Sequence, residues 1–209
     1  MPHPENDMTQ NPPDLATEEA VSILRGRHLP GVLVFIIADM AVFCMLFVGF
    51  MVDRMKDVAL FNNSAIALDV RFGVANTLIL VTSGLFVVLA VNAARAGLRK
   101  TTRGWLLLSF LVGAGFGVSK IVEYSIKISS GITMQTNPFY MYYYALTGAH
   151  FLHFVGGMIA LAVLWVLAGR EATVSRNTFN LIESGALYWH MVDLLWLFLF
   201  PMLYLLVPR

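Results

Sequence analysis

Long runs of apolar residues alternate with short polar stretches along this chain. Five of the runs reach the ~20 residues that an α-helix needs to cross a bilayer. They predict spanning helices over residues 30–52, 72–96, 104–128, 138–168 and 181–207. The short link 97–103 indicates a tight antiparallel pair of helices, whereas the link 53–71 is longer and mixed in charge. The pattern therefore predicts an all-α integral membrane bundle over residues 30–209.

Composition agrees with this class. Hydrophobic residues make up 58% of the chain and charged residues 13%, about half the charged share of a soluble domain. The polar segment 1–29 lacks the basic start of a signal peptide, and we expect it to be partly disordered, with a short surface helix over 17–28. The net charge of +1 gives no indication of nucleic-acid binding. Cys44 is the only cysteine, so no intramolecular disulfide is expected.

Lysine and arginine are unevenly divided between the two ends of the predicted helices, and such residues are enriched on the cytoplasmic side of a membrane. One side carries Arg25, Arg27, Arg95, Arg99, Lys100, Arg103, Arg170 and Arg176. The other side carries Arg54, Lys56, Arg71, Lys127 and Arg209. We therefore expect the N-terminus in the cytoplasm and the C-terminus in the periplasm.

Small and aromatic residues predict how the helices pack. Gly113 and Gly117 form a GxxxG pattern, and Gly156 and Gly157 provide a second site where backbones can approach closely. We interpret these glycines as packing sites. The tyrosines within 140–144 are expected to form an aromatic belt at the outer membrane interface.

Ionisable side chains inside the predicted spans are the main candidates for function, because each is costly in hydrocarbon and needs a partner or a role. In the last span, His190 and Asp193 lie three residues apart and share one helical face. That face must point into protein. Asp39 lies near the middle of the first span, where its own helix offers no cation. It is either protonated or paired across helices, and a role in carrying protons is possible for it.

The third span carries Lys120, Glu123 and Lys127, whose spacing puts all three on one face. This pattern favours a local ion pair, with Lys127 extending to water. Depth in the bilayer also places Glu123 near His150 of the fourth span.

His150 and His153 could bind a metal from one side, but they project the same way and cannot serve as opposite axial ligands of one haem. Interhelical hydrogen bonds are the alternative interpretation, and depth places His153 near His190 and Asp193. The candidate set, predicted to form a buried polar network, is Asp39, Glu123, His150, His153, Glu183, His190 and Asp193.

Several of these residues stand in recognisable local patterns. They are YWHMVDLLWLFLF over 188–200 with Glu183 upstream, GAHFLH over 148–153 followed by VGG, Asn76-Thr77, Ser83-Gly84, Glu123-Tyr124, and Asp39. Together, and in this order on successive helices, they resemble subunit III of the haem–copper oxidases. The resemblance covers nearly all of residues 30–207. Lys120 departs from the family pattern, because many members have an uncharged residue there.

The resemblance implies a non-catalytic subunit of the bacterial inner membrane that binds no haem, copper or iron itself. It implies a partner, the catalytic subunit I, which this chain would steady and whose proton uptake it would influence. Family members with seven helices hold membrane lipids in a cleft beside their first two helices. This chain corresponds to the family from its third helix onward.

The short form occurs in cytochrome c and quinol oxidases and in a branch associated with nitric oxide reductase. The stretch FYMYYYALTGAHFLH and the polar N-terminal segment resemble the second branch. The alternative function is a free-standing membrane transporter or a metal-binding helix bundle that uses the same polar residues. Transporters usually show broken helices or repeated halves, and the sequence shows neither.

Overall fold

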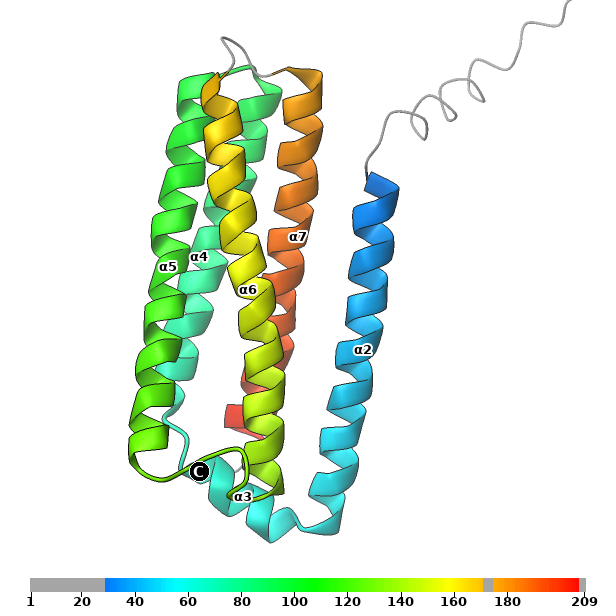
Figure 1. Cartoon of the computed structure of the whole chain (residues 1–209), viewed down its shortest axis with the longest axis vertical. Helices are drawn as coiled ribbons and strands as arrows, with labels where there is room; N and C mark the ends of the chain where they lie inside the picture. The colour runs from blue at the N-terminus through cyan, green and yellow to red at the C-terminus, as the bar shows by residue number, and fades with distance from the viewer. Residues whose placement is uncertain (1–28, 171–174, 207–209) are drawn as a thin grey trace, which may run out of the picture.

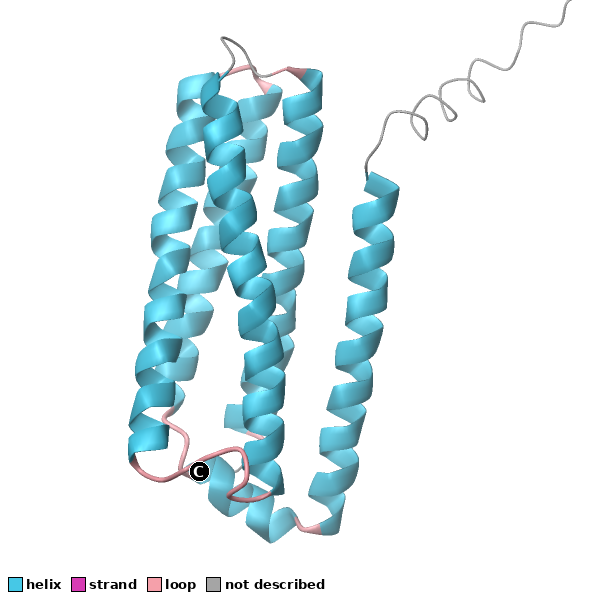
Figure 2. Ribbon diagram, in the orientation of Figure 1, coloured by secondary structure: helices cyan, strands magenta, loops and turns pink. Residues whose placement is uncertain are grey.

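The computed structural model describes residues 29–170 and 175–206. The predicted polar segment and the surface helix over 17–28 lie outside this part of the chain. The elements are α2 (Leu29–Lys56), α3 (Val58–Ile66), α4 (Val70–Arg95), α5 (Arg99–Ser129), α6 (Pro138–Arg170), α7 (Arg176–Phe200) and the π-helical turn η1 (Pro201–Leu205). Every regular element in these residues is helical (Figure 2).

The predicted five crossings are confirmed. Within the described residues, five helical segments are long and apolar enough to span a membrane: Gly31–Lys56, Val70–Arg95, Arg99–Ser129, Pro138–Arg170 and Arg176–Leu205. The last helix begins earlier than predicted, since Ser175 caps it by accepting a hydrogen bond from the backbone N–H of Thr178. The link 53–71 contains the short helix α3, which Asp57 caps in the same manner.

Helices α4 to α7 form an upright bundle, and α2 stands beside it (Figure 1). Helices α4 and α5 form the predicted tight antiparallel pair. Gly97, with a φ of +71°, closes the turn between them, and the backbone N–H of Leu98 bonds to the carbonyl of Ala93. Ser83 and Ser109 join the two helices by donating to each other's backbone carbonyl at 2.9 and 3.0 Å.

Trp189 of α7 fills the centre of the bundle and is fully buried. A Cβ added at Gly113 of α5 would lie 3.0 Å from its ring, and one at Gly157 of α6 would lie 2.7 Å away. Larger residues at these two positions would therefore displace the indole. This confirms the interpretation of these glycines as packing sites.

Helix α2 contacts the bundle mainly through aromatic rings near its C-terminal end. Phe50 packs edge-on against Phe61 of α3 at 5.4 Å and lies 6.2 Å from Phe139 of α6, ring centre to ring centre. Further along α2, Phe35 lies 6.2 Å from Tyr188 of α7. The N-terminal half of α2 and the bundle border an apolar groove of about 400 Å³.

The expectation of an aromatic belt over 140–144 is wrong for two of its tyrosines. Tyr140 and Tyr143 are buried in the bundle, at 4% and 0% exposure. They are three residues apart, so the helical period puts both on the inward side of α6. Tyr142 and Tyr144 are partly buried and donate hydrogen bonds to Asp53 and to the carbonyl of Ile132, at 2.8 Å each.

Candidate functional site

The predicted polar residues lie in separate clusters and do not form one network. Glu123 belongs to a cluster at the end of the bundle near η1, which we name the Glu123 cluster: Lys120, Glu123, Tyr143 and Tyr204. Asp39 pairs with His153, and His190 lies beside Asp193. Glu183 pairs with Arg95 at the other end of the bundle. His150 is enclosed by aromatic rings.

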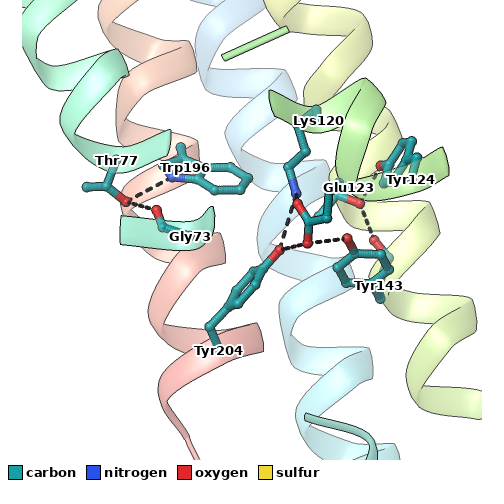
Figure 3. Close-up of polar contacts among 9 residues, drawn as sticks. Gly73, Thr77, Lys120, Glu123, Tyr124, Tyr143, Trp196 and Tyr204 are labelled. Atoms are coloured by element: carbon teal, nitrogen blue, oxygen red, sulfur yellow. Dashed lines mark hydrogen bonds and ion pairs between the residues drawn. The ribbon is translucent and has the colours of Figure 1, made fainter. Parts of the chain in front are cut away.

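The Glu123 cluster is a buried ion pair with two tyrosine donors (Figure 3). The Nζ of Lys120 lies 2.8 Å from Oε2 of Glu123. The other carboxylate oxygen, Oε1, accepts from the hydroxyls of Tyr143 and Tyr204 at 2.7 and 2.6 Å. Burying two charges is unfavourable unless their remaining hydrogen-bonding positions are also satisfied, and the tyrosines supply this. The predicted local ion pair on α5 is therefore confirmed.

Aromatic rings surround the ammonium groups of Lys120 and Lys127. The Nζ of Lys120 lies 4.7 Å from the ring centre of Trp196, an arrangement typical of a cation–π contact. The indole N–H of Trp196 donates to the hydroxyl of Thr77 at 3.0 Å, which links α7 to α4 (Figure 3). Lys127 is also buried, 5.6 Å from the ring centre of Tyr143. The expectation that it extends to water is wrong, because it lies on the inward face of α5.

His150 forms no hydrogen bond with Glu123, although both His150 and Lys120, the ion-pair partner of Glu123, lie beside Trp196. His150 is fully buried, and neither ring nitrogen has a hydrogen-bond partner in the described part of the chain. Its ring centre lies 5.5 Å from that of Phe116 and 5.4 Å from that of Trp196. Depth alone suggested the pairing, but Lys120 on the same helix and Tyr143 and Tyr204 take up both oxygens of Glu123.

Asp39 pairs across helices with His153, one of the two states expected for it. Its Oδ1 lies 3.0 Å from Nε2 of His153, and the side chains are 12% and 21% exposed. His153 was expected beside the polar pair of the last helix. Its imidazole contacts α2 instead, while only its backbone carbonyl bonds to α7, through the hydroxyl of Tyr188 at 3.1 Å.

The surroundings of His153 orient its imidazole. The Nδ1 of His153 lies 2.8 Å from the carbonyl oxygen of Ala149, which can only accept, so this contact is a hydrogen bond when Nδ1 carries the hydrogen. Nε2 is then the nitrogen that faces Oδ1 of Asp39. The imidazole therefore links the carboxyl group of α2 to the backbone of α6.

His190 and Asp193 lie on one face of α7, as their spacing predicted. The Nδ1 of His190 is 3.5 Å from Oδ2 of Asp193. Asp193 is 8% exposed and lies so close to Gly84 of α4 that a Cβ there would collide with Oδ2. Its Oδ1 has no hydrogen-bond partner among the described residues. The imidazole of His190, in contrast, is 41% exposed.

Glu183 lies nearer the basic end of the bundle than the other candidates. Its Oε1 is 3.3 Å from the guanidinium of Arg95, and its side chain is 25% exposed. It is therefore less buried than predicted, because this part of α7 borders an open groove against α4.

Within residues 29–170 and 175–206, no three histidine, cysteine or carboxylate side chains gather closely enough to hold a metal ion. The three intramembrane histidines contact different neighbours: Asp39 for His153, Asp193 for His190 and Trp196 for His150.

Sequence reasoning missed the two tyrosines that bind Glu123. Tyr143 was assigned to the interface belt, although its position four residues before Thr147 and seven before His150 puts it on the inward stripe of α6. Tyr204 follows Pro201, and the turn η1 brings it under α5. No local pattern in the sequence marks that contact.

Comparisons with known proteins agree with this arrangement. The family model for cytochrome c oxidase subunit III matches residues 8–207. Cytochrome c oxidase subunit 3 of Corynebacterium diphtheriae is 28% identical over 91% of this chain and 95% of its own length. The Synechocystis protein of that name is 32% identical over 84% of this chain and 74% of its own. A probable subunit 3 from Mycobacterium bovis is 29% identical over 83% and 85%, respectively.

The resemblance seen in the sequence is thus confirmed over nearly the whole chain. In the structure Asp39 lies on α2, Glu123 on α5, the two histidines on α6 and the His190–Asp193 pair on α7. The chain belongs to the cytochrome c oxidase subunit III family, as a membrane-embedded, non-catalytic oxidase subunit.

Proposed function

We propose that this chain packs beside the haem-bearing catalytic subunit of a bacterial cytochrome c oxidase and stabilises it during turnover. The observation that carries the proposal is the family match over residues 8–207. The chain itself holds no haem, copper or iron in this proposal. The different neighbours of His150, His153 and His190 support this, since within the described residues none of the three lies against the imidazole of another.

The proposed location is the bacterial inner membrane, with the N-terminus on the cytoplasmic side. The turn at Gly97, with Arg95, Arg99 and Arg103, would then face the cytoplasm. Membrane lipids would cover the exposed apolar side chains of the outer helix faces. The Glu123 cluster would lie toward the periplasm.

The Asp39–His153 pair is the proposed site of an effect on proton uptake. A carboxyl group and an imidazole lie 3.0 Å apart there, in a partly exposed position where α2 meets α6. Carboxyl and imidazole side chains are the groups that form proton relays inside membrane proteins. In this proposal the pair supplies protons to the neighbouring catalytic subunit and carries out no redox step.

Oxygen is the proposed acceptor of the catalytic subunit. The relatives from Corynebacterium, Mycobacterium and Synechocystis carry the name cytochrome c oxidase subunit 3, which favours oxygen over nitric oxide. The tyrosine-rich start of α6 resembles the branch associated with nitric oxide reductase. The test must therefore distinguish oxygen reduction from nitric oxide reduction.

The test is purification of the tagged, full-length chain from its native membranes in mild detergent, followed by an optical spectrum, metal analysis and activity assays. We expect haem and copper to co-purify with a larger subunit, together with oxygen consumption. A partner that contains haem and non-haem iron but no copper, and that consumes nitric oxide, would identify the complex as a nitric oxide reductase and not as an oxidase.

The chain purified free of partners provides the control for cofactor content. We expect no stoichiometric haem, copper or iron in it. A stoichiometric metal would support the metal-binding bundle. A chain that never associates with a haem protein would support a free-standing transporter.

A further inference from the structure

The imidazole of His190 points outward from the middle of a membrane-spanning helix. His190 lies halfway along the span Arg176–Leu205, so at 1.5 Å per residue it is roughly 20 Å from either end. Its side chain is nevertheless 41% exposed, whereas the neighbouring Asp193 faces Gly84 and is buried. A polar group at this depth is costly unless another polar group contacts it.

The bundle provides a polar contact to only one of the two ring nitrogens of His190. Nδ1 faces Oδ2 of Asp193 at 3.5 Å, and no described residue forms a hydrogen bond with Nε2. The other ionisable groups in the interior of the spans have partners or are enclosed: Asp39 has His153, and Glu123 has Lys120. His190 therefore differs from them in facing out of the chain.

A groove between α4 and α7 leads away from His190. It has a volume of about 410 Å³, and Val88, Val91, Ala186 and Leu187 form its apolar wall. At its far end stands the Arg95–Glu183 ion pair, with Arg95 66% exposed. The face thus presents a polar group at mid-membrane, then an apolar hollow, then a charged group near the proposed cytoplasmic surface.

This pattern fits a protein helix better than a lipid. A lipid carries its polar headgroup at the membrane surface, where it could reach Arg95, but its acyl chain has no donor or acceptor to offer His190. A transmembrane helix offers polar side chains at any depth. A hydroxyl group suits this position, because it can donate to Nε2 or accept from it, whichever tautomer His190 adopts.

We propose that the α4–α7 face is the surface by which this chain docks onto the catalytic subunit, and that a helix of that subunit places a hydroxyl-bearing side chain against His190. This inference rests on the proposed function. The inference adds three points to the proposed function: the face that binds, the depth of the polar contact and the chemistry of the partner residue.

Site-specific photo-cross-linking in the assembled complex tests the face directly. A benzoylphenylalanine is placed at Leu187, which borders the groove and is 37% exposed. The matched control places it at Val122 of α5, which is 43% exposed on a different face. We expect the catalytic subunit to be cross-linked from Leu187 and not from Val122.

Other results would overturn the inference in distinguishable ways. Cross-links to the catalytic subunit from Val122 and not from Leu187 would assign docking to another face. Cross-links from Leu187 only to lipid, or to a second copy of this chain, would assign the groove to that occupant. In these cases co-purified haem would show that the proposed function still stands. Absence of any haem-bearing partner would remove both proposals.

Variants of His190 test the polar contact. We expect His190→Leu to weaken association about threefold to twentyfold, the equivalent of the ~0.6–1.7 kcal/mol of an interhelical hydrogen bond in a membrane at 1.4 kcal/mol per tenfold. His190→Gln, whose amide can reach the same partner, should retain most of the association. Both variants also alter the contact with Asp193, so the melting temperature of the partner-free chain is measured for each, and the loss of association in His190→Leu should exceed any loss that reduced stability explains. Equal association for His190→Leu and the unmodified chain would contradict the contact.

Discussion

Asp39 of α2 and His153 of α6 are joined through a contact of 3.0 Å between Oδ1 and Nε2. It is a polar link between the outermost helix and the four-helix bundle, in a region where α2 otherwise makes apolar contacts. Since Nδ1 of His153 faces the Ala149 carbonyl, Nε2 is the ring nitrogen that makes this link to Asp39.

Asp39 lies within the first span and its side chain is only 12% exposed, so we expect it to react with a hydrophobic carbodiimide, a reagent that attacks protonated acids in membranes. We expect Asp39→Asn to abolish this labelling while leaving assembly intact, because the amide is similar in size and can donate to Nε2. If the proposed function holds, proton uptake by the complex should slow. The measurement is mass-spectrometric mapping of the modified residue.

The control for this experiment is Asp53→Asn. Asp53 lies at the end of the same helix but is held by Lys56 and Tyr142 at 2.7 and 2.8 Å. Its replacement should leave labelling unchanged. Labelling that persists in Asp39→Asn, or that maps to Glu123 or Asp193, would show that another carboxyl group is the protonated one.

Loss of Lys120 should destabilise the bundle strongly. In Lys120→Met the buried carboxylate of Glu123 keeps its two tyrosine donors but loses its cation, and breaking a buried ion pair from one side costs ~3–5 kcal/mol. The double variant Lys120→Met/Glu123→Gln removes both charges and should recover much of this loss. Thermal unfolding in detergent measures both, with the exposed Ser125→Ala as a control on the same helix. A double variant no more stable than the single one would argue against a charge effect.

Gly84 should tolerate no side chain while Asp193 is present. A Cβ at this position collides with Oδ2 of Asp193, and overpacking of this kind costs ~1–3 kcal/mol. We expect Gly84→Ala to lower the melting temperature, and we expect Asp193→Ala to lower it as well by removing the partner of His190. The double variant should be more stable than the sum of the single effects predicts, since the collision disappears. Strict additivity in this cycle would indicate that the two residues do not meet.

Gly157 and Gly148 form a matched pair on α6. A Cβ at Gly157 would lie 2.7 Å from the ring of Trp189, whereas one at Gly148 would have nothing within 4 Å. Gly157→Ala should destabilise the chain by ~1–3 kcal/mol. Gly148→Ala should be neutral or stabilising by up to ~1 kcal/mol, because alanine favours a helix. Equal melting temperatures for the two variants would contradict the packing around Trp189.

The sequence predicted the features that depend on local pattern. Spans follow from length and hydropathy, and the α4–α5 hairpin follows from the short basic link. The Lys120–Glu123 pair follows from helical spacing within one element. The family followed from residues in order along the chain.

Contacts between helices were predicted poorly, because depth gives one coordinate and the order of helices around the bundle supplies the other two. Depth predicted Glu123 beside His150, whereas the hydrogen bonds of its carboxylate come from Tyr143 and Tyr204. His153 was placed near α7, but its imidazole faces Asp39 on α2. Tyr204 lies in the π-helical turn η1, whose i→i+5 spacing differs from that of an α-helix, so an α-helical count along α7 does not predict where its side chain points.

The hydrogen bond from Tyr204 to Glu123 also orders events during synthesis. The ribosome delivers α4 and α5 early, and Ser83 and Ser109 can join this hairpin as soon as both helices are in the bilayer. The buried charges of α5 enter the bilayer before one of their hydrogen-bond partners exists, because η1 is translated after α6 and α7. Until Tyr204 arrives, the carboxylate of Glu123 lacks one of its two tyrosine donors. A short stretch translated after α7 therefore completes the hydrogen bonding of a charged group on a helix inserted well before it.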